Sequence, residues 1–139
     1  MSRRNKNKHQ QVKKDTVNFT QEDFLPTTRE EMDARGWDYC DVILVSGDAY
    51  IDSPFIGVAM VGRMLERMGY RVGMIGQPDV KSDKDIKRLG EPRLYWGVSG
   101  GSVDSMVSNY TATKKFRNSD DYTPGGKNDK RPDRAISVY

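Results

Sequence analysis

Residues 40–78 decide the fold, and they read CDVILVSGDAYIDSPFIGVAMVGRMLERMGYRVGMIGQP. Residues 42–45 are an unbroken apolar run, residues 46–48 are a polar break, and apolar residues then recur at helical spacing through residues 55–68. A second short apolar run follows at residues 70–75. Two parallel strands need a crossover of about a dozen residues, usually a helix, and this spacing supplies it. The stretch therefore predicts one β–α–β unit.

The predicted crossover helix carries a start signal, an apolar stripe and a stop signal. Ser53 and Pro54 suit the cap and the first position of a helix, and Gly69 suits its end. A stripe that faces the sheet is predicted by residues spaced three and four apart: Val58, Val61, Leu65 and Met68.

A short helix is predicted before the first strand. Thr28 and Glu31 fit a capping box, in which a hydroxyl and a carboxylate satisfy opposite backbone amides at a helix start. The helix is expected to run through Arg35 and to end at Gly36, and Trp37 is expected to pack it against the first strand.

The chain after residue 78 continues the alternation of strands and helices. Residues 82–89 predict a short charged helix capped by Ser82, with Ile86 and Leu89 as its apolar face, and residues 94–98 predict a third strand. Apolar residues at helical spacing then follow a Gly-rich turn: Val103, Met106, Val107 and Tyr110. This alternation predicts a small doubly wound α/β domain, a parallel sheet of flavodoxin-like strand order 2-1-3 with helices on both faces.

The composition divides the chain into a core and two ends. The 139 residues carry a formal net charge of +3, with a pI near 9.0, and residues 1–14 hold six basic residues and no acidic one. We expect residues 1–21 to be a disordered basic arm, residues 22–110 the domain, and residues 111–139 an irregular segment whose last five residues resemble the opening of a strand. Solvated ends, with no aromatic residue for base stacking among the basic residues 1–14, argue against a nucleic-acid partner. No run has the length of a signal peptide core or a membrane span, so we expect a cytoplasmic protein with no membrane partner.

Two loops are expected to meet at one rim of the sheet. In strand order 2-1-3, the loops after the first and third strands are neighbours at the carboxyl edge, where ligands bind in open α/β sheets. The candidate rim residues for a ligand or a domain interface are Ser46, Gly47, Asp48, Tyr50, Asp52, Ser99, Gly100, Gly101 and Ser102. The alternative is that these loops are plain turns, with Asp48 fixing the first and Asp52 helping to cap the helix. The Gly-rich turn lacks the Lys of a phosphate-binding loop, and Asp104 beside it would repel a phosphate.

Metal chemistry has few candidate ligands in this sequence. Cys40 is the only cysteine and His9, in the basic arm, is the only histidine. A site made of thiolates and imidazoles is therefore excluded, and Cys40, before a buried strand, is expected to be inert. We assign no catalytic residue and no metal ligand.

Ten short segments of the sequence resemble the start of the YgiQ-type radical SAM proteins. They are FLPTTREEM at 24–32, RGWD at 35–38, DVILVSGDAY at 41–50, RVG at 71–73, QPD at 77–79, GVS at 97–99, DSMV at 104–107, NYTA at 109–112, DYTPGG at 121–126 and KRPDRA at 130–135. The resemblance implies an N-terminal domain, similar in fold to cobalamin-binding domains, that precedes a radical SAM barrel as its partner. It also implies, for the full-length family, a [4Fe-4S] cluster on a C-x₃-C-x₂-C motif that cleaves S-adenosylmethionine reductively.

This chain has no such motif, so we expect an N-terminal fragment that binds no cluster itself. It also departs from the family pattern at two positions: Ser53 stands where members often have His, and Val80 where they often have an aromatic residue. The missing His removes the obvious axial ligand and argues against cobalamin. The alternative hypothesis is a free-standing α/β module that binds a ligand or a partner and has no catalysis of its own.

Overall fold

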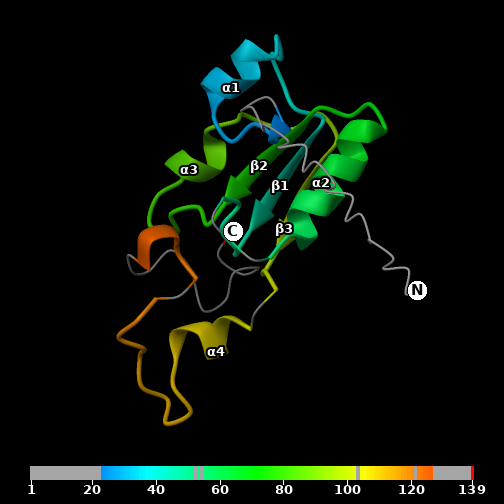
Figure 1. Ribbon diagram of the computed structural model, residues 1–139. Coiled ribbons are helices and arrows are strands. Elements are labelled where there is room, and N and C mark those ends of the chain that lie inside the picture. Colours follow the sequence, from blue (N-terminus) through cyan, green and yellow to red (C-terminus); the bar gives the residue numbers. More distant parts are fainter. Residues whose placement is uncertain (1–22, 52, 54, 103, 121, 127–138) are drawn as a thin grey trace, which may run out of the picture.

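The computed structural model describes residues 23–51, 53, 55–102, 104–120, 122–126 and 139. Its elements, in chain order, are α1 (Arg29–Ala34), β1 (Val42–Ser46), α2 (Gly57–Arg67), β2 (Val72–Gly76), α3 (Lys84–Lys87), β3 (Tyr95–Ser99), α4 (Ser105–Asn109) and a 3₁₀ turn (Pro124–Gly126). The strands form one parallel sheet in the order β2-β1-β3 (Figure 1). The predicted α/β class and strand order are confirmed.

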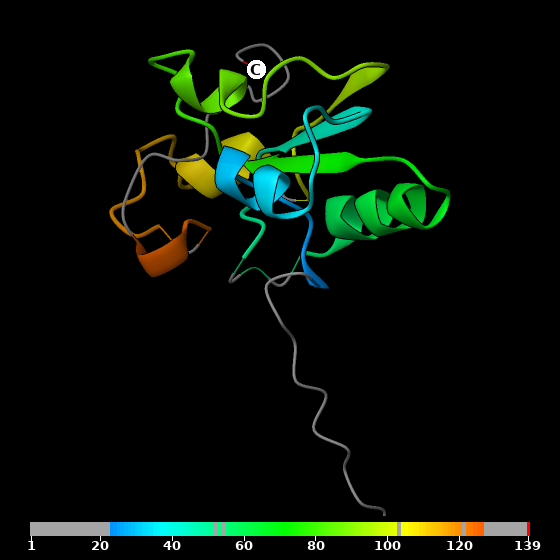
Figure 2. The same ribbon diagram turned by 90° about the horizontal axis from the view of Figure 1, so that it is seen from above.

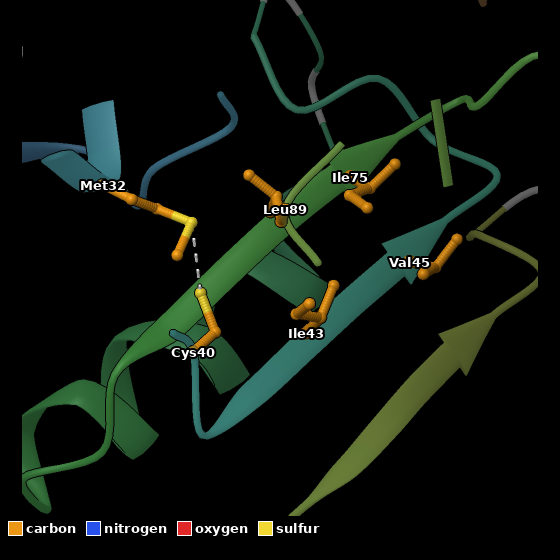
Figure 3. Packing of buried hydrophobic residues seen from close by; sticks show 6 residues of the cluster. All are labelled: Met32, Cys40, Ile43, Val45, Ile75 and Leu89. Atoms are coloured by element: carbon orange, nitrogen blue, oxygen red, sulfur yellow. Dashed lines mark hydrogen bonds between the residues drawn. The ribbon is translucent and has the colours of Figure 1, made fainter. Parts of the chain in front are cut away.

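The central strand β1 is buried at every position because both of its faces are covered. Alternate side chains of a strand point to opposite faces, so Ile43 and Val45 enter one core and Val42 and Leu44 the other. The first core also contains Met32 of α1, Cys40, Ile75 and Leu89 (Figure 3). The second contains Leu25, Val72 and Met74, with Val58 and Leu65 of α2 packed against it. Seen from above, α2 and α3 lie on opposite sides of the sheet (Figure 2).

Helix α1 begins with the predicted capping box. The Thr28 hydroxyl accepts a hydrogen bond from Glu31 N (3.3 Å), and Glu31 Oε2 accepts from Thr28 N (3.2 Å). The helix ends at its C-cap Arg35, and Gly36 follows with a φ of +68°, a conformation that a side chain would strain. Trp37 packs against the first core, as expected.

Helix α2 starts later than predicted and turns a different side to the sheet. Ser53 does not cap it: its hydroxyl accepts from Phe55 N (3.2 Å) in a turn before the helix, and the helix begins after Ile56 without a side-chain cap. Pro54 lies outside the described residues. Val58 and Leu65 of the predicted stripe pack on the core, whereas Val61 and Met68 are exposed.

Gly62 explains the rotation of α2. A Cβ at this position would lie 2.4 Å from Leu25 Cδ1 and 3.2 Å from Leu44 Cδ1. The helix backbone reaches the sheet only where the side chain is absent, so Gly62, rather than Val61, marks the face of closest approach.

The later elements follow the predicted order with shifted boundaries. Ser82 does not cap α3, because its hydroxyl donates to Asp79 Oδ2 (3.2 Å); Asp83 is the N-cap residue. Leu89 is fully buried and Ile86 packs beside it, as predicted. Helix α4 is shorter than predicted and begins after Asp104, whose carboxylate accepts from Met106 N and Val107 N.

Helix α4 does not pack its apolar side chains on a face of the sheet. Met106 and Val107 are more than half exposed, and α4 lies beyond the carboxyl ends of the strands (Figure 1). The chain then folds back in a small hairpin, in which Tyr110 and Phe116 pair and their rings lie 4.5 Å apart.

The predicted arm at residues 1–21 and the strand opening at residues 135–138 lie outside the described residues, and the domain boundary at residue 110 stays a prediction. In the part of the chain that the structure describes, no helix is both long and apolar enough to cross a membrane.

Candidate functional site

The loops after β1 and β3 meet at the carboxyl edge of the sheet. Ser46 and Ser99 are register partners at the ends of their strands, and Gly47 N donates to Ser99 O (3.0 Å). Asp48 Oδ2 accepts a hydrogen bond from Ser102 N at 2.7 Å, which joins the two loops directly. The structure thus brings together the two loops that the sequence placed side by side.

The polar side chains of this rim bind the backbone of the loops themselves. The Ser46 hydroxyl accepts from Asp48 N (3.0 Å), and the Ser99 hydroxyl accepts from Gly101 N (3.2 Å). Asp48 is only 5% exposed. The cavity next to it, between the β1 loop and α2, measures about 10 Å³, room for one water molecule at most. These contacts hold the loops in place, and a ligand role for the rim stays a prediction.

Two of the predicted rim residues are not part of this hydrogen-bonded group. The Tyr50 side chain leaves the rim and packs against the second core, where its hydroxyl accepts from Leu25 N (2.9 Å) and its ring meets that of Phe24 edge-on. Burial raises the pKa of Tyr50 above its ordinary value. Tyr50 therefore anchors the N-terminal segment to the sheet. Asp52 lies outside the described residues.

Sequence reasoning missed the role of Gln77, which it read only as the end of a strand. Gln77 is 5% exposed, and its backbone N donates to Ser46 O (2.8 Å). Its side-chain Nε2 donates to Gly47 O (3.2 Å) and to Tyr122 O (2.8 Å). Gln77 thereby joins the end of β2, the β1 loop and the segment around Tyr122. Its φ of +46° is unusual for a residue with a side chain and marks a position held by its surroundings. The sequence feature that could have pointed to this role is the side-chain amide of Gln77 directly after a buried strand.

A larger hollow opens at the same edge of the sheet, but on the side of β2. Its volume is about 300 Å³, and its lining comes from the loop after Gln77, from Ile86 and from Tyr139. This is the lower end of the range for small-molecule sites. The sequence pointed to the junction of β1 and β3, so the hollow lies one strand away from the predicted rim.

The described residues do not fit an iron–sulfur cluster. Such clusters are held by several thiolates, and no group of three or more His, Cys, Asp or Glu in the described part of the chain is arranged to hold a metal ion. Cys40 is fully buried in the first core, with its Sγ 3.7 Å from Met32 Sδ (Figure 3). Burial raises the pKa of the Cys40 thiol to about 11, so the thiolate needed for metal binding or nucleophilic attack is strongly disfavoured.

Comparison with known proteins places these features in a family. Residues 24–139 match the family described as Radical SAM N-terminal. The chain is 63% identical over 116 residues to a UPF0313 protein of Thermotoga petrophila, 60% to one of Fusobacterium nucleatum and 59% to one of Pseudomonas aeruginosa. The matched stretch is 84% of this chain but only 20%, 20% and 16% of those relatives, respectively. No solved structure matches the chain.

The resemblance to the YgiQ-type radical SAM proteins is therefore confirmed, and the chain spans about a fifth of the length of its Thermotoga relative. It belongs to the Radical SAM N-terminal family.

Proposed function

We propose that this chain is the N-terminal domain of a radical SAM enzyme and that it supports a catalytic barrel supplied by the rest of the full-length protein. The observation that carries the proposal is the family match across residues 24–139, together with a coverage of only 20% of the Thermotoga relative. In the full-length protein, the [4Fe-4S] cluster would supply the electron that cleaves S-adenosylmethionine. In this proposal, the residues of this chain would hold neither the cluster nor the reacting atoms, because Cys40 is its only cysteine and is buried.

The arrangement of the carboxyl edge supports this role. The loops after β1 and β3 are held together by Asp48 and Ser102, and Gln77 connects the edge to Tyr122. Helix α4 and the described residues 110–120 lie beyond this same edge (Figure 1). These described residues lie on the side where open α/β sheets place their ligands, so the rim would face the barrel or its substrate.

A fusion protein tests the proposal. This chain replaces the matched 116 residues of the Thermotoga petrophila relative, and the fusion is purified anaerobically and reconstituted with iron and sulfide. The expected result is bound iron, the spectroscopic signature of a reduced [4Fe-4S] cluster, and release of methionine from S-adenosylmethionine in the presence of a reductant. The unaltered relative is the positive control, and the 139-residue chain alone is the negative one.

Either of two results would refute the proposal. One is a cluster that assembles on the 139-residue chain alone. The other is a fusion that folds but cleaves no S-adenosylmethionine under conditions in which the unaltered relative does; the alternative, a free-standing binding module, would then be preferred.

A further inference from the structure

The two edges of the sheet differ. The outer edge of β2 is covered by the segment before α1, because Met74 N donates to Pro26 O (2.9 Å). Leu94 N donates to Asp41 O on the β1 side, so the next N–H, that of Tyr95, points away from β1. Among the described residues, no backbone group bonds to this outer edge of β3. Within the described part of the chain, β3 therefore presents an open edge.

The side chains of β3 are also uncovered, on both faces. Its register pairs Tyr95 with Val42, on the face of α2, and pairs Trp96 and Val98 with Ile43 and Val45, on the opposite face. Tyr95, Trp96 and Val98 are 48%, 39% and 41% exposed, whereas β1 is buried throughout. Strands of parallel sheets are normally covered on both faces. Among the described residues, β3 lacks the helices or loops that would cover its side chains in this way.

Helix α2, which packs on β2 and β1, carries a second apolar surface on the face of the sheet that Tyr95 shares. At about 100° per residue, Val61, Met64 and Met68 share one flank of the helix, and Arg63 and Glu66 lie on the other. The polar flank faces the covered edge of the sheet, because Glu66 pairs with Arg35 (2.9 Å) at the end of α1. The apolar flank therefore turns toward β3, and its three side chains are each at least half exposed.

We propose that the polypeptide that follows this domain in the full-length protein docks along the edge of β3 and over the apolar flank of α2. We call the six residues involved the docking face, of which Trp96 and Val98 lie on the opposite side of the sheet from the other four: Val61, Met64, Met68, Tyr95, Trp96 and Val98. A strand from the later part pairs along β3, and a helix covers the apolar flank of α2. The inference rests on the proposed function. It identifies the surface of the domain against which the rest of the full-length protein packs.

The length of the relatives argues for this occupant. The match covers 20% of the Thermotoga relative, so about four fifths of that protein lies outside it. In a doubly wound sheet that begins in the order 2-1-3, the next strand is added beside the third. Methionine side chains adapt to irregular partner surfaces, which suits a helix that packs against a separate part of the same protein.

Methionine oxidation tests the proposal in the fusion protein described above. Met64, Met68 and Met106 are 62%, 69% and 54% exposed, and Met106 on α4 lies outside the docking face. In the 139-residue chain, hydrogen peroxide is expected to oxidise all three at similar rates. Reactivity follows exposure, so burial in the fusion is expected to slow Met64 and Met68 about fivefold and to leave Met106 the least affected of the three.

Two variants of the fusion add a second readout. Met64→Lys places a charge in the interface, and Tyr95→Pro removes the outward N–H at the start of β3 without touching the ladder to β1. Both are expected to restore oxidation of Met68 in the fusion, whereas the matched variant Met106→Lys is expected to leave Met68 protected.

The outcomes separate this proposal from the proposed function. A fusion that cleaves S-adenosylmethionine while Met64 and Met68 stay as reactive as in the isolated chain would overturn the docking face alone. Protected methionines in a fusion without a cluster would support the docking face and refute the proposed catalysis. Protection that already exists in the isolated chain, with dimers on gel filtration, would assign the face to a second copy and overturn the proposal.

Discussion

At the scale of single residues, close approach and burial decide what each position tolerates. Gly62 is the point where α2 meets the sheet, and Cys40 fills part of the first core. Both are small residues surrounded by fully buried side chains, so their chemistry is set by the space around them.

The substitution Gly62→Ala is expected to destabilise the domain by about 1–3 kcal/mol, because the new methyl group overlaps Leu25 in a packed core. The matched control is Gly57→Ala in the same helix, where nothing lies within 4 Å of the added Cβ. That control is expected to be neutral or to stabilise by about 0.5–1 kcal/mol. Urea unfolding of both variants measures the difference, and equal stabilities would contradict the packing described here.

Cys40 predicts a dependence of stability on alkaline pH. Burial, and secondarily the charge of Asp41, raises the pKa of the thiol from 9.0 to about 11. The thiol of the unfolded chain ionises first as the pH rises. The contribution of Cys40 to stability is therefore fully present below about pH 9 and is lost as the pH rises through about 11, an effect of roughly 2–3 kcal/mol.

Denaturant unfolding between pH 8 and 11 measures this effect as the difference between the wild type and Cys40→Ala, which cancels the titration of tyrosines and lysines. A difference that does not change with pH would show that the thiol ionises as easily in the folded as in the unfolded chain.

At the scale of elements, the site depends on contacts between loops more than on any single loop. Local signals placed a turn after β1 and another after β3, and the parallel register brought Ser46 opposite Ser99. The Asp48 carboxylate then ties the first loop to Ser102.

Replacing Asp48 by Ala is expected to cost about 1.5–3 kcal/mol, because a hydrogen bond to a charged group is lost in a buried place. Amide hydrogen exchange at Ser102 is expected to accelerate more than exchange in β1. Asp48→Asn keeps an acceptor oxygen and is expected to lose less stability than the Ala variant. If exchange at Ser102 stayed unchanged in Asp48→Ala, the bridge would not be what holds the loops together.

At the scale of the whole molecule, Gln77 connects the sheet to the segment beyond its carboxyl edge. The two hydrogen bonds from its side chain reach Gly47 and Tyr122, residues that are far apart in the sequence. This places Tyr122 and the 3₁₀ turn after it near the rim.

The variant Gln77→Ala is expected to loosen residues 119–126 while the sheet stays intact, because it removes the side-chain donor but keeps the backbone bond to Ser46. Hydrogen exchange at the 3₁₀ turn Pro124–Gly126 is expected to rise well above that of β2. Pro78→Ala, one residue further along, serves as a control. Equal protection in the Gln77→Ala variant and the wild type would mean that other contacts hold this segment.

Local patterns in the sequence were enough to predict which elements form, their order and the family, though not the bounds of α2, α3 and α4. Apolar runs of strand length, the capping box at Thr28 and Glu31, and the β–α–β spacing are local signals, because each depends on neighbours within a turn or a strand. The strand order 2-1-3 followed from the winding rules of such units, and with it the meeting of the two loops.

Three features could be read from the folded structure alone: the side of α2 that faces the sheet, the sheet edge that is open among the described residues, and the contacts of Gln77. The stripe rule favoured Val61 and Met68, but the contact of Gly62 with Leu25 rotated the helix away from them. Gln77 gains its role from Gly47 and Tyr122. These outcomes depend on contacts between residues that are distant in the chain. A local sequence pattern cannot predict them, because close packing depends on the shapes of all the side chains in contact.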